Sequence, residues 1–226
     1  MYEQIKKNTV KSENQLKKNE YIKYINPDGK GIRVLFLGNS ITLHGIKTEI
    51  GWENEWGMAA SKKENDYVHL MVEKIKEIHN DAVFSICQVA EWEGNYKAPQ
   101  SVDMLFEESK KFGADIIIAR FIENCPVKDF DGELFEKAYF SFVKSFDTTK
   151  KAQIILTTGF WRHPGDDIIR KNAQKNGCAV VELGDLGEID EMKAIGLFWH
   201  KGVAEHPGDK GMEAITERIF KKIRQF

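Results

Sequence analysis

This sequence of 226 residues has few cysteines, a net charge close to zero and no long apolar run. The three cysteines are an odd number at wide spacing with no CxxC pair, which indicates reduced, mostly buried thiols and argues against disulfides or a zinc site. No apolar run approaches the ~18 residues that a membrane-spanning helix needs. The formal net charge is -2, so there is no basic field of the kind that binds nucleic acid. We therefore expect neither nucleic acid nor a membrane as a partner.

The N-terminal stretch is polar throughout. Residues 1–18 are rich in lysine but contain no apolar core, so they do not resemble a secretory signal, and a cytoplasmic location is expected unless a leader has been removed. Residues 1–30 end in the turn signal Asn26-Pro27-Asp28-Gly29. We interpret them as a polar N-terminal extension, followed by one domain over residues 31–226. The length suits this division, because single α/β domains often run to ~200–250 residues.

Short apolar runs alternate with stretches of helical periodicity after residue 30. The runs are residues 32–37, 82–89, 115–119, 153–158 and 179–183. The helical stretches are residues 66–79, 101–112, 134–146, 166–176 and 208–223. Apolar strands that alternate with helices are typical of a parallel sheet covered on both faces. We therefore predict an α/β fold on five parallel strands, with the aromatic residues of 134–146 in the core and not in a cofactor site.

Residues 41–65 interrupt this alternation and contain Trp52 and Trp56. Long loops inside compact domains are often functional. Two interpretations stand side by side. The loop either serves the function directly, or it is a lid that packs on the sheet edge to cover hydrophobic surface.

The first predicted strand runs directly into Gly38, Asn39 and Ser40. This pattern is typical of a buried parallel strand that ends at a tight turn and presents a hydroxyl group. In open α/β sheets, ligands bind at the C-terminal ends of the strands. Ser40 is therefore a candidate nucleophile that needs a base to take its proton.

Six histidines could supply that base. His69 and His79 fall within or at the end of a predicted helix, which favours a structural role. His44 lies close to the serine in sequence, but beyond the turn. His163 and His206 lie in loops that can return to the same sheet edge. Position alone leaves His206 as one candidate among three.

Three motifs together resemble the SGNH hydrolases, the GDSL-like esterase and lipase superfamily. The run Gly38-Asn39-Ser40-Ile41-Thr42 is similar to the first block, in which the serine is the nucleophile. The segment 115–124 resembles the third block, and it places Asn124 at the oxyanion asparagine. His206-Pro207 before a helix resembles the fifth block, in which the histidine is the base. The blocks occur in the family's order and span residues 32–225.

The resemblance implies a flavodoxin-like α/β/α sandwich with a five-stranded parallel sheet. It further implies that Ser40 attacks an ester carbonyl while His206 removes its proton. The oxyanion would be held by the Ser40 N–H, the Asn124 side chain and a backbone N–H after the second strand, where Glu91 stands nearest. No metal or organic cofactor is implied.

The sequence departs from the family at the residue that fixes the histidine. The family places aspartate three residues before it, and here that position is Val203. One interpretation is a Ser–His dyad oriented by a backbone carbonyl. The other is a carboxylate from elsewhere in the chain, and of these Glu123 is the most plausible, with an ion pair to Arg120 as its alternative role. The other carboxylates considered are Glu205, Glu91 and Glu93.

Substrate-lining candidates are Trp92, Arg120 and Trp161. Aromatic rings stack on sugar faces, although tryptophans also serve as core or lid packing. The leading hypothesis is a serine esterase that removes a small acyl group, such as acetyl, from a carbohydrate or similar alcohol. Its rivals are a weak or inactive glycan-binding module, which Val203 motivates, and an acyltransferase that uses the same acyl-enzyme. A nucleotide binder is disfavoured, because the first loop lacks glycine-rich phosphate-binding spacing.

Overall fold

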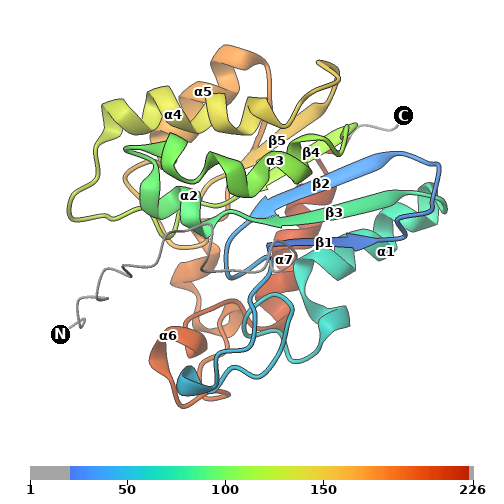
Figure 1. The fold of residues 1–226 in the computed structure, drawn as a ribbon. Coiled ribbons are helices and arrows are strands. Elements are labelled where there is room, and N and C mark those ends of the chain that lie inside the picture. Colours follow the sequence, from blue (N-terminus) through green and yellow to red (C-terminus); the bar gives the residue numbers. More distant parts are fainter. Residues whose placement is uncertain (1–20, 224–226) are drawn as a thin grey trace.

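The computed structural model describes residues 21–223, which form a mixed sheet with helices on both faces (Figure 1). The strands are β1 (Ile22–Ile25), β2 (Arg33–Gly38), β3 (Val83–Gln88), β4 (Ile116–Arg120), β5 (Gln153–Thr157) and β6 (Ala179–Val181). Their spatial order is β1-β3-β2-β4-β5-β6. The strands from β2 to β6 pair in parallel, and β1 pairs with β3 in antiparallel orientation.

The α/β sandwich and its five parallel strands are confirmed. The sheet has six strands because β1 adds an antiparallel edge strand, which the sequence analysis did not predict. β1 is four residues long and half of it is partly exposed, so its apolar pattern is weak. Residues 1–20, which belong to the N-terminal extension proposed above, lie outside the described residues.

The α-helices of the described chain follow the expected positions closely. They are α1 (Tyr67–Ile78), α2 (Ala90–Asn95), α3 (Glu107–Lys110), α4 (Gly132–Ser145), α5 (Asp166–Asn176), α6 (Lys201–Ala204) and α7 (Asp209–Phe220). α1 begins where Asp66 accepts a hydrogen bond from the backbone N–H of His69, and α5 ends at Gly177 with φ of 65°. The expected helix over 101–112 is instead a 3₁₀ turn followed by α3. The short helices α2 and α6 were not predicted.

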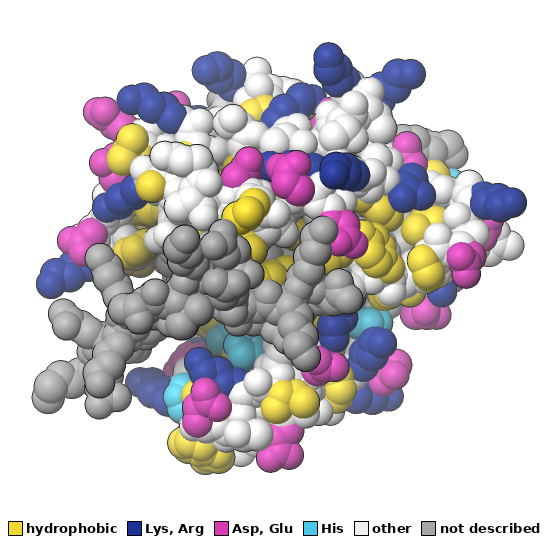
Figure 2. Space-filling view, in the orientation of Figure 1, with side chains coloured by type: hydrophobic (Ala, Val, Ile, Leu, Met, Phe, Trp, Pro, Cys, Tyr) yellow, Lys and Arg dark blue, Asp and Glu magenta, His cyan; other side chains and the backbone are white. Residues whose placement is uncertain are grey.

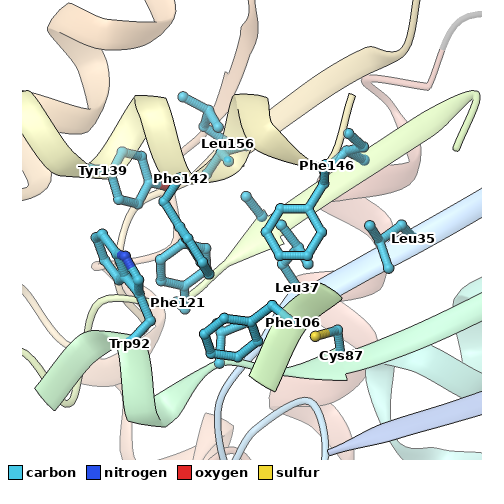
Figure 3. Close-up of a cluster of buried hydrophobic side chains, with 14 of the residues drawn as sticks. Leu35, Leu37, Cys87, Trp92, Phe106, Phe121, Tyr139, Phe142, Phe146 and Leu156 are labelled. Atoms are coloured by element: carbon cyan, nitrogen blue, oxygen red, sulfur yellow. The ribbon is translucent and has the colours of Figure 1, made fainter. Parts of the chain in front are cut away.

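Two hydrophobic cores lie on opposite faces of the sheet. One core packs α1 and α7 against the sheet, and the other packs α2, α4 and α5 against it. In the second core Trp92 stacks on Phe142 with ring centroids 4.6 Å apart, and Phe106 and Phe146 pack edge-on to Phe142 (Figure 3). The aromatic residues of α4 are therefore core residues, as predicted. Such contacts contribute about 0.5–1.5 kcal/mol per pair beyond simple area burial.

A third, smaller core joins two loops beyond the C-terminal ends of the strands. Its buried members come from the loop after β2 and from the segment that precedes α7; they are Trp52, Met58, Ala59, Ala194 and Val203. Trp52 is fully buried and contacts Trp56 and Phe198 edge-on or tilted. In Figure 1 these two segments lie together below the sheet, around α6. We call this group the loop core. The lid interpretation of residues 41–65 accounts for the burial of Trp52.

The strand order places a topological switch point between β2 and β4. The chain leaves β2 toward β3 on one side, and the later strands are added on the other side. Ligands of open α/β sheets bind in the crevice at such a point, outside the carboxyl ends of the strands. Ser40 follows β2 and Asn124 follows β4, so both lie at this edge.

Candidate active site

Ser40 stands on a tight turn directly after β2. The carbonyl oxygen of Asn39 accepts hydrogen bonds from the N–H groups of Thr42 and Leu43, at 2.9 and 3.0 Å, which closes the turn. A Cβ atom at Gly38 would overlap the side chain of Thr42, so only glycine fits there. Ser40 itself is partly exposed.

His206 reaches this serine from the far end of the chain. Its Nε2 lies 2.8 Å from Ser40 Oγ, although the two residues are 166 positions apart. The loop that carries His206 is fixed by a hydrogen bond of 2.9 Å from the N–H of Ala194 to the His206 carbonyl. The structure thus brings together the two residues that the sequence nominated as nucleophile and base.

The second ring nitrogen of His206 faces a backbone carbonyl. Nδ1 lies 2.6 Å from the oxygen of Gly202. A carbonyl oxygen only accepts hydrogen bonds, so Nδ1 carries the proton and the unprotonated Nε2 faces the hydroxyl of Ser40. This tautomer is the one that a general base needs. The geometry matches the backbone-carbonyl interpretation of the sequence.

Val203 and Glu205 do not orient the histidine. Val203 is fully buried in the loop core, where its apolar side chain packs beside Trp52. Glu205 pairs with Lys193 at 3.2 Å. Burial lowers the pKa of His206 to about 4, although the hydrogen bond to Gly202 acts in the opposite direction. His206 is therefore neutral near pH 7.

Glu123, the carboxylate that the sequence analysis considered most plausible for orienting His206, does not have that role, because Nδ1 of His206 faces Gly202. Its carboxylate accepts hydrogen bonds from Arg120 Nη2 and Asn39 Nδ2, both at 2.6 Å, and from the Phe160 N–H at 2.8 Å. Burial by itself would raise the pKa of Glu123, but Arg120 and these hydrogen bonds bring it below its ordinary value. The ion pair that the sequence analysis kept as the alternative is the observed arrangement.

Arg120 is not a substrate-lining residue. It is fully buried at the end of β4, and its Nη2 also donates to Asn39 Oδ1 at 2.8 Å. Arg120 and Glu123 therefore hold the side chain of the residue that precedes Ser40. The prediction failed because a lone arginine at a strand end gives no sign of how deeply it will be buried.

Asn124 lies on the exposed side of the same strand end. Its Nδ2 donates to Glu93 Oε2 at 2.7 Å, and its backbone N–H approaches Glu93 Oε1 at 3.3 Å. The amide nitrogen carries two hydrogens, so one remains for a ligand. The N–H groups of Ser40 and Glu91 meet no acceptor within residues 21–223. Glu91 lies in the first turn of α2, where N–H groups lack helical partners.

The tryptophans divide into three environments. Trp161 is partly buried and lies edge-on to the His206 ring, with centroids 5.2 Å apart and planes at 82°. Trp92 is fully buried in the core under α4, so its prediction as a lining residue is wrong. Trp199 is 75% exposed and packs beside His200. Trp161 is the lining candidate that reaches the site.

The other histidines considered have different partners. His163 is buried, with Nε2 3.0 Å from the carbonyl oxygen of Cys125, and its Nδ1 accepts from the Gly165 N–H. The Nδ1 of His44 lies 2.6 Å from the carbonyl oxygen of its neighbour Gly45. Neither is hydrogen-bonded to Ser40 in the described structure.

Residues 21–223 contain neither a candidate metal site nor a candidate membrane span. No group of three or more His, Cys, Asp or Glu side chains could hold a metal ion there. No helix of this part of the chain is long and apolar enough to cross a bilayer. Figure 2 shows acidic and basic side chains interspersed over one face of the molecule, without a large field of either sign.

Sequence reasoning missed three members of the site. Gly202 acts through its backbone carbonyl, which leaves no trace in residue identity. Asn39 was quoted as part of a motif, but its bridging of Arg120 and Glu123 depends on two strands meeting. Glu93 was considered only as a partner for His206. Glu93 lies five residues after the end of β3, in α2, and its burial depends on partners that follow β2 and β4.

No family model matches the sequence, and no curated protein is similar to it at a significant level. Solved structures are similar in fold. An acetylxylan esterase from Geobacillus stearothermophilus matches with a TM-score of 0.54 and 14% identity, over 88% of this chain and 96% of that chain. A two-domain esterase active on acetylated mannans matches with a TM-score of 0.54 and 19% identity, over 87% of this chain. This chain spans 50% of the length of that esterase.

A family two carbohydrate esterase from Cellvibrio japonicus matches with a TM-score of 0.54 and 16% identity, over 86% of this chain and 61% of that chain. At identities this low, the structural similarity establishes a common fold and nothing more. The chain therefore has the SGNH hydrolase fold, as the motifs led us to expect.

Proposed function

We propose that this chain is a serine esterase that removes small acyl groups, in the first place acetyl, from carbohydrate esters. One observation carries the proposal. A continuous pair of hydrogen bonds joins the Gly202 carbonyl, the imidazole of His206 and the hydroxyl of Ser40. This arrangement provides a nucleophile, a base in the correct tautomer, and a group that holds the base in place.

The reaction proceeds in two steps through an acyl-enzyme. Ser40 Oγ forms a bond to the ester carbonyl carbon as its proton moves to His206 Nε2. The tetrahedral intermediate then collapses with cleavage of the bond to the sugar oxygen, which takes the proton from Nε2 and leaves as a hydroxyl. A water molecule next attacks the acyl group on Ser40, giving its proton to the same nitrogen. Collapse of the second intermediate releases the carboxylic acid and restores the serine hydroxyl. No redox or metal step is needed.

Three N–H donors support stabilisation of the oxyanion in this proposal. They are the backbone N–H groups of Ser40 and Glu91 and the remaining hydrogen on Asn124 Nδ2. Donors that are fixed before the reaction stabilise the developing charge without reorganisation, and the loss of one typically costs ~10²–10³ in kcat.

The choice of carbohydrate as the alcohol rests on two supports. The proteins of similar fold are described as acting on acetylated mannans, acetylxylan or xylo-oligosaccharides. In this chain the partly exposed Trp161 beside His206 offers an aromatic ring next to the reacting atoms, where a sugar ring can pack.

The first experiment compares the wild type with Ser40→Ala on p-nitrophenyl acetate and on acetylated xylo- and manno-oligosaccharides. We expect Ser40-dependent acetate release, and labelling of the wild type by a fluorophosphonate that is absent from Ser40→Ala. His206→Ala should lower kcat by ~10³ or more. Background rates for all proteins, with no labelling of Ser40, would favour a non-catalytic glycan-binding module.

An acyltransferase remains the second candidate, because the acyl-enzyme is common to both reactions. The test is to add mono- or disaccharide acceptors during turnover of p-nitrophenyl acetate. A hydrolase releases acetate in proportion to p-nitrophenol. A transferase releases more p-nitrophenol than acetate and forms an acetylated acceptor that mass spectrometry detects.

A further inference from the structure

Glu93 is a fully buried carboxylate that no step of the proposed reaction uses. It lies on α2, two residues after the Glu91 N–H, and it faces the strand ends that carry Asn39 and Asn124. Glutamate is rarely buried without a functional or structural partner, because a charged group loses its hydration there. The groups that hydrogen-bond to this carboxylate therefore indicate its role.

Every recorded partner of Glu93 belongs to the rim of the proposed oxyanion hole. Oε2 accepts from Asn124 Nδ2 at 2.7 Å, and Oε1 accepts from Asn39 Nδ2 at 3.0 Å and from the Asn124 N–H at 3.3 Å. Asn39 precedes Ser40, so one carboxyl group is tied to the segments that supply all three donors. These segments come from the ends of β2, β3 and β4.

The chemistry of a carboxylate decides the orientation of Asn124. A side-chain amide can be turned so that either its oxygen or its nitrogen faces a neighbour. An ionised carboxylate only accepts hydrogen bonds, so it selects the orientation with Nδ2 toward Glu93. In that orientation the second hydrogen of Nδ2 is left for the oxyanion. A protonated or amidated residue at position 93 can also donate a hydrogen bond, so it permits the opposite orientation.

We propose that Glu93 is a positioning residue of the oxyanion hole, which acts by fixing the amide of Asn124 against Asn39. This inference rests on the proposed esterase function. It adds a requirement that the Ser40–His206 pair alone does not contain. The base and nucleophile are insufficient unless the carboxylate on α2 is ionised.

The charges around Glu93 make its ionisation sensitive to pH. Glu123 accepts a hydrogen bond from the same Asn39 Nδ2 as Glu93, and Arg120 compensates the charge of Glu123 directly. Burial and the charge of Glu123 together raise the pKa of Glu93 to about 7. The thiol of Cys125 and the phenol of Tyr139 also lie within electrostatic range, and both are neutral in this setting because burial raises the pKa of each.

The experiment is a double-mutant cycle on Glu93→Gln and Asn124→Ala, measured with p-nitrophenyl acetate. Glutamine keeps the shape of glutamate, but its NH₂ must face one of the N–H groups from which the carboxylate accepts a hydrogen bond. We expect Glu93→Gln to lower kcat about 10–100-fold with KM within about twofold, and Asn124→Ala to lower kcat ~10²–10³. The double variant should be within about threefold of Asn124→Ala, because both changes remove the same interaction.

Two further readouts separate positioning from general stabilisation. Because the pKa of Glu93 is about 7, kcat of the wild type should rise with pH in a step near pH 7, and this step should be absent from Glu93→Gln. Glu93→Asp, which remains a carboxylate, should recover part of the rate that Glu93→Gln loses. Asp147→Asn is the matched control. It alters another buried carboxylate, which accepts from Lys144, Thr149 and Ala152 before β5, at the opposite end of the sheet. We expect it to lower Tm but to leave kcat unchanged.

The possible outcomes are distinct. If the wild type shows Ser40-dependent turnover and Glu93→Gln is equally fast with the same pH profile, this inference is wrong while the esterase function stands. Multiplicative losses in the double variant also overturn it, because Glu93 would then act independently of Asn124. If the wild type shows no Ser40-dependent turnover, the proposed function and this inference fail together.

Discussion

The imidazole of His206 is held by two hydrogen bonds and one aromatic edge, and none of these contacts is a carboxylate. Burial lowers the pKa of the ring, and no hydrogen-bonded carboxylate stabilises its charged form. The imidazole of His206 is therefore a weaker base, but it remains unprotonated in acid.

This environment predicts an unusual acid limb of activity. Since burial lowers the pKa of His206 to about 4, protonation of this base should lower kcat/KM only as pH decreases through about 4, below the separate step near pH 7 that Glu93 gives in the wild type, and not through the ordinary histidine value of ~6.5. The clearest measurement is the pH profile of Glu93→Gln, in which the second ionisation is removed. A single limb near pH 6.5 in that variant would contradict the assignment.

Val203 occupies the place of the family's aspartate but belongs to the loop core. Restoring the family residue with Val203→Asp should not improve catalysis, because Nδ1 already has an acceptor in Gly202. It should destabilise the fold by about 3 kcal/mol or more, since a carboxyl group replaces a fully buried side chain.

Val203→Ala is the control for that substitution, with an expected loss of about 1–3 kcal/mol. Denaturant unfolding and p-nitrophenyl acetate kinetics measure both properties. A Val203→Asp variant that is faster than the wild type and as stable as Val203→Ala would mean that the aspartate can reach His206.

At the scale of elements, the loop core is the structure that connects the two halves of the site. It joins the loop after β2, which follows Ser40, to the segment that ends at His206. The N–H of Met58 also donates to the Ser40 carbonyl at 2.8 Å, so this loop contacts the serine directly. Its packing, together with β2 and α7, sets the distance between hydroxyl and imidazole.

Removing the largest side chain of the loop core should therefore uncouple activity from global folding. Trp52→Ala is expected to lose local order at a lower temperature than the sheet, so that activity disappears below the midpoint of the far-UV circular dichroism transition. The energetic cost of such a truncation is about 3–5 kcal/mol. The measurement is the temperature dependence of both signals on one sample.

Phe146→Ala is the matched control, because Phe146 is fully buried in the core under α4 and outside the loop core. In that variant the two midpoints should fall together. Coincident midpoints in Trp52→Ala as well would show that the loop core melts only with the whole domain.

Several elements and part of the site could be predicted from the sequence, for identifiable physical reasons. Strands such as β4 are continuously apolar and buried on both faces, so their pattern is local and strong. α5 was found at its observed bounds because Gly177 ends it. β1 and α2 are short and depend on partners far along the chain, so no local pattern identifies them.

Within the site, Ser40 and His206 were found because side-chain identity carries their chemistry. The role of Gly202 lies in a backbone atom, and the errors on Glu123 and Trp92 have another cause. Both residues were placed near the correct edge of the sheet, but the direction of a side chain depends on neighbours from other elements. Arg120 draws Glu123 inward, and Phe142 covers Trp92.

At the scale of the whole molecule, the buried carboxyl pair links stability to pH. The folded-state pKa of Glu93 is about 7, above its ordinary value of 4.5, so the folded state holds a proton that the unfolded state releases. This contribution to stability is fully present below pH 4.5 and is lost as pH rises through about 7.

The free energy of unfolding should therefore decrease by roughly 1–3 kcal/mol between pH 5 and pH 8 from this group. Urea unfolding at several pH values measures it, and Glu93→Gln should flatten the dependence in this range. An unchanged slope in the variant would assign the dependence to other groups.

The hydroxyl and the imidazole stand 166 positions apart in the chain, and the loop core that sets their distance is built from the same two regions. During synthesis, most of the sheet can form before the histidine has left the ribosome. A nascent or C-terminally truncated chain without the histidine therefore carries the serine without its base. Recovery of esterase activity after dilution from denaturant should accordingly report the docking of the last segment, at a later time than the recovery of strand and helix signals.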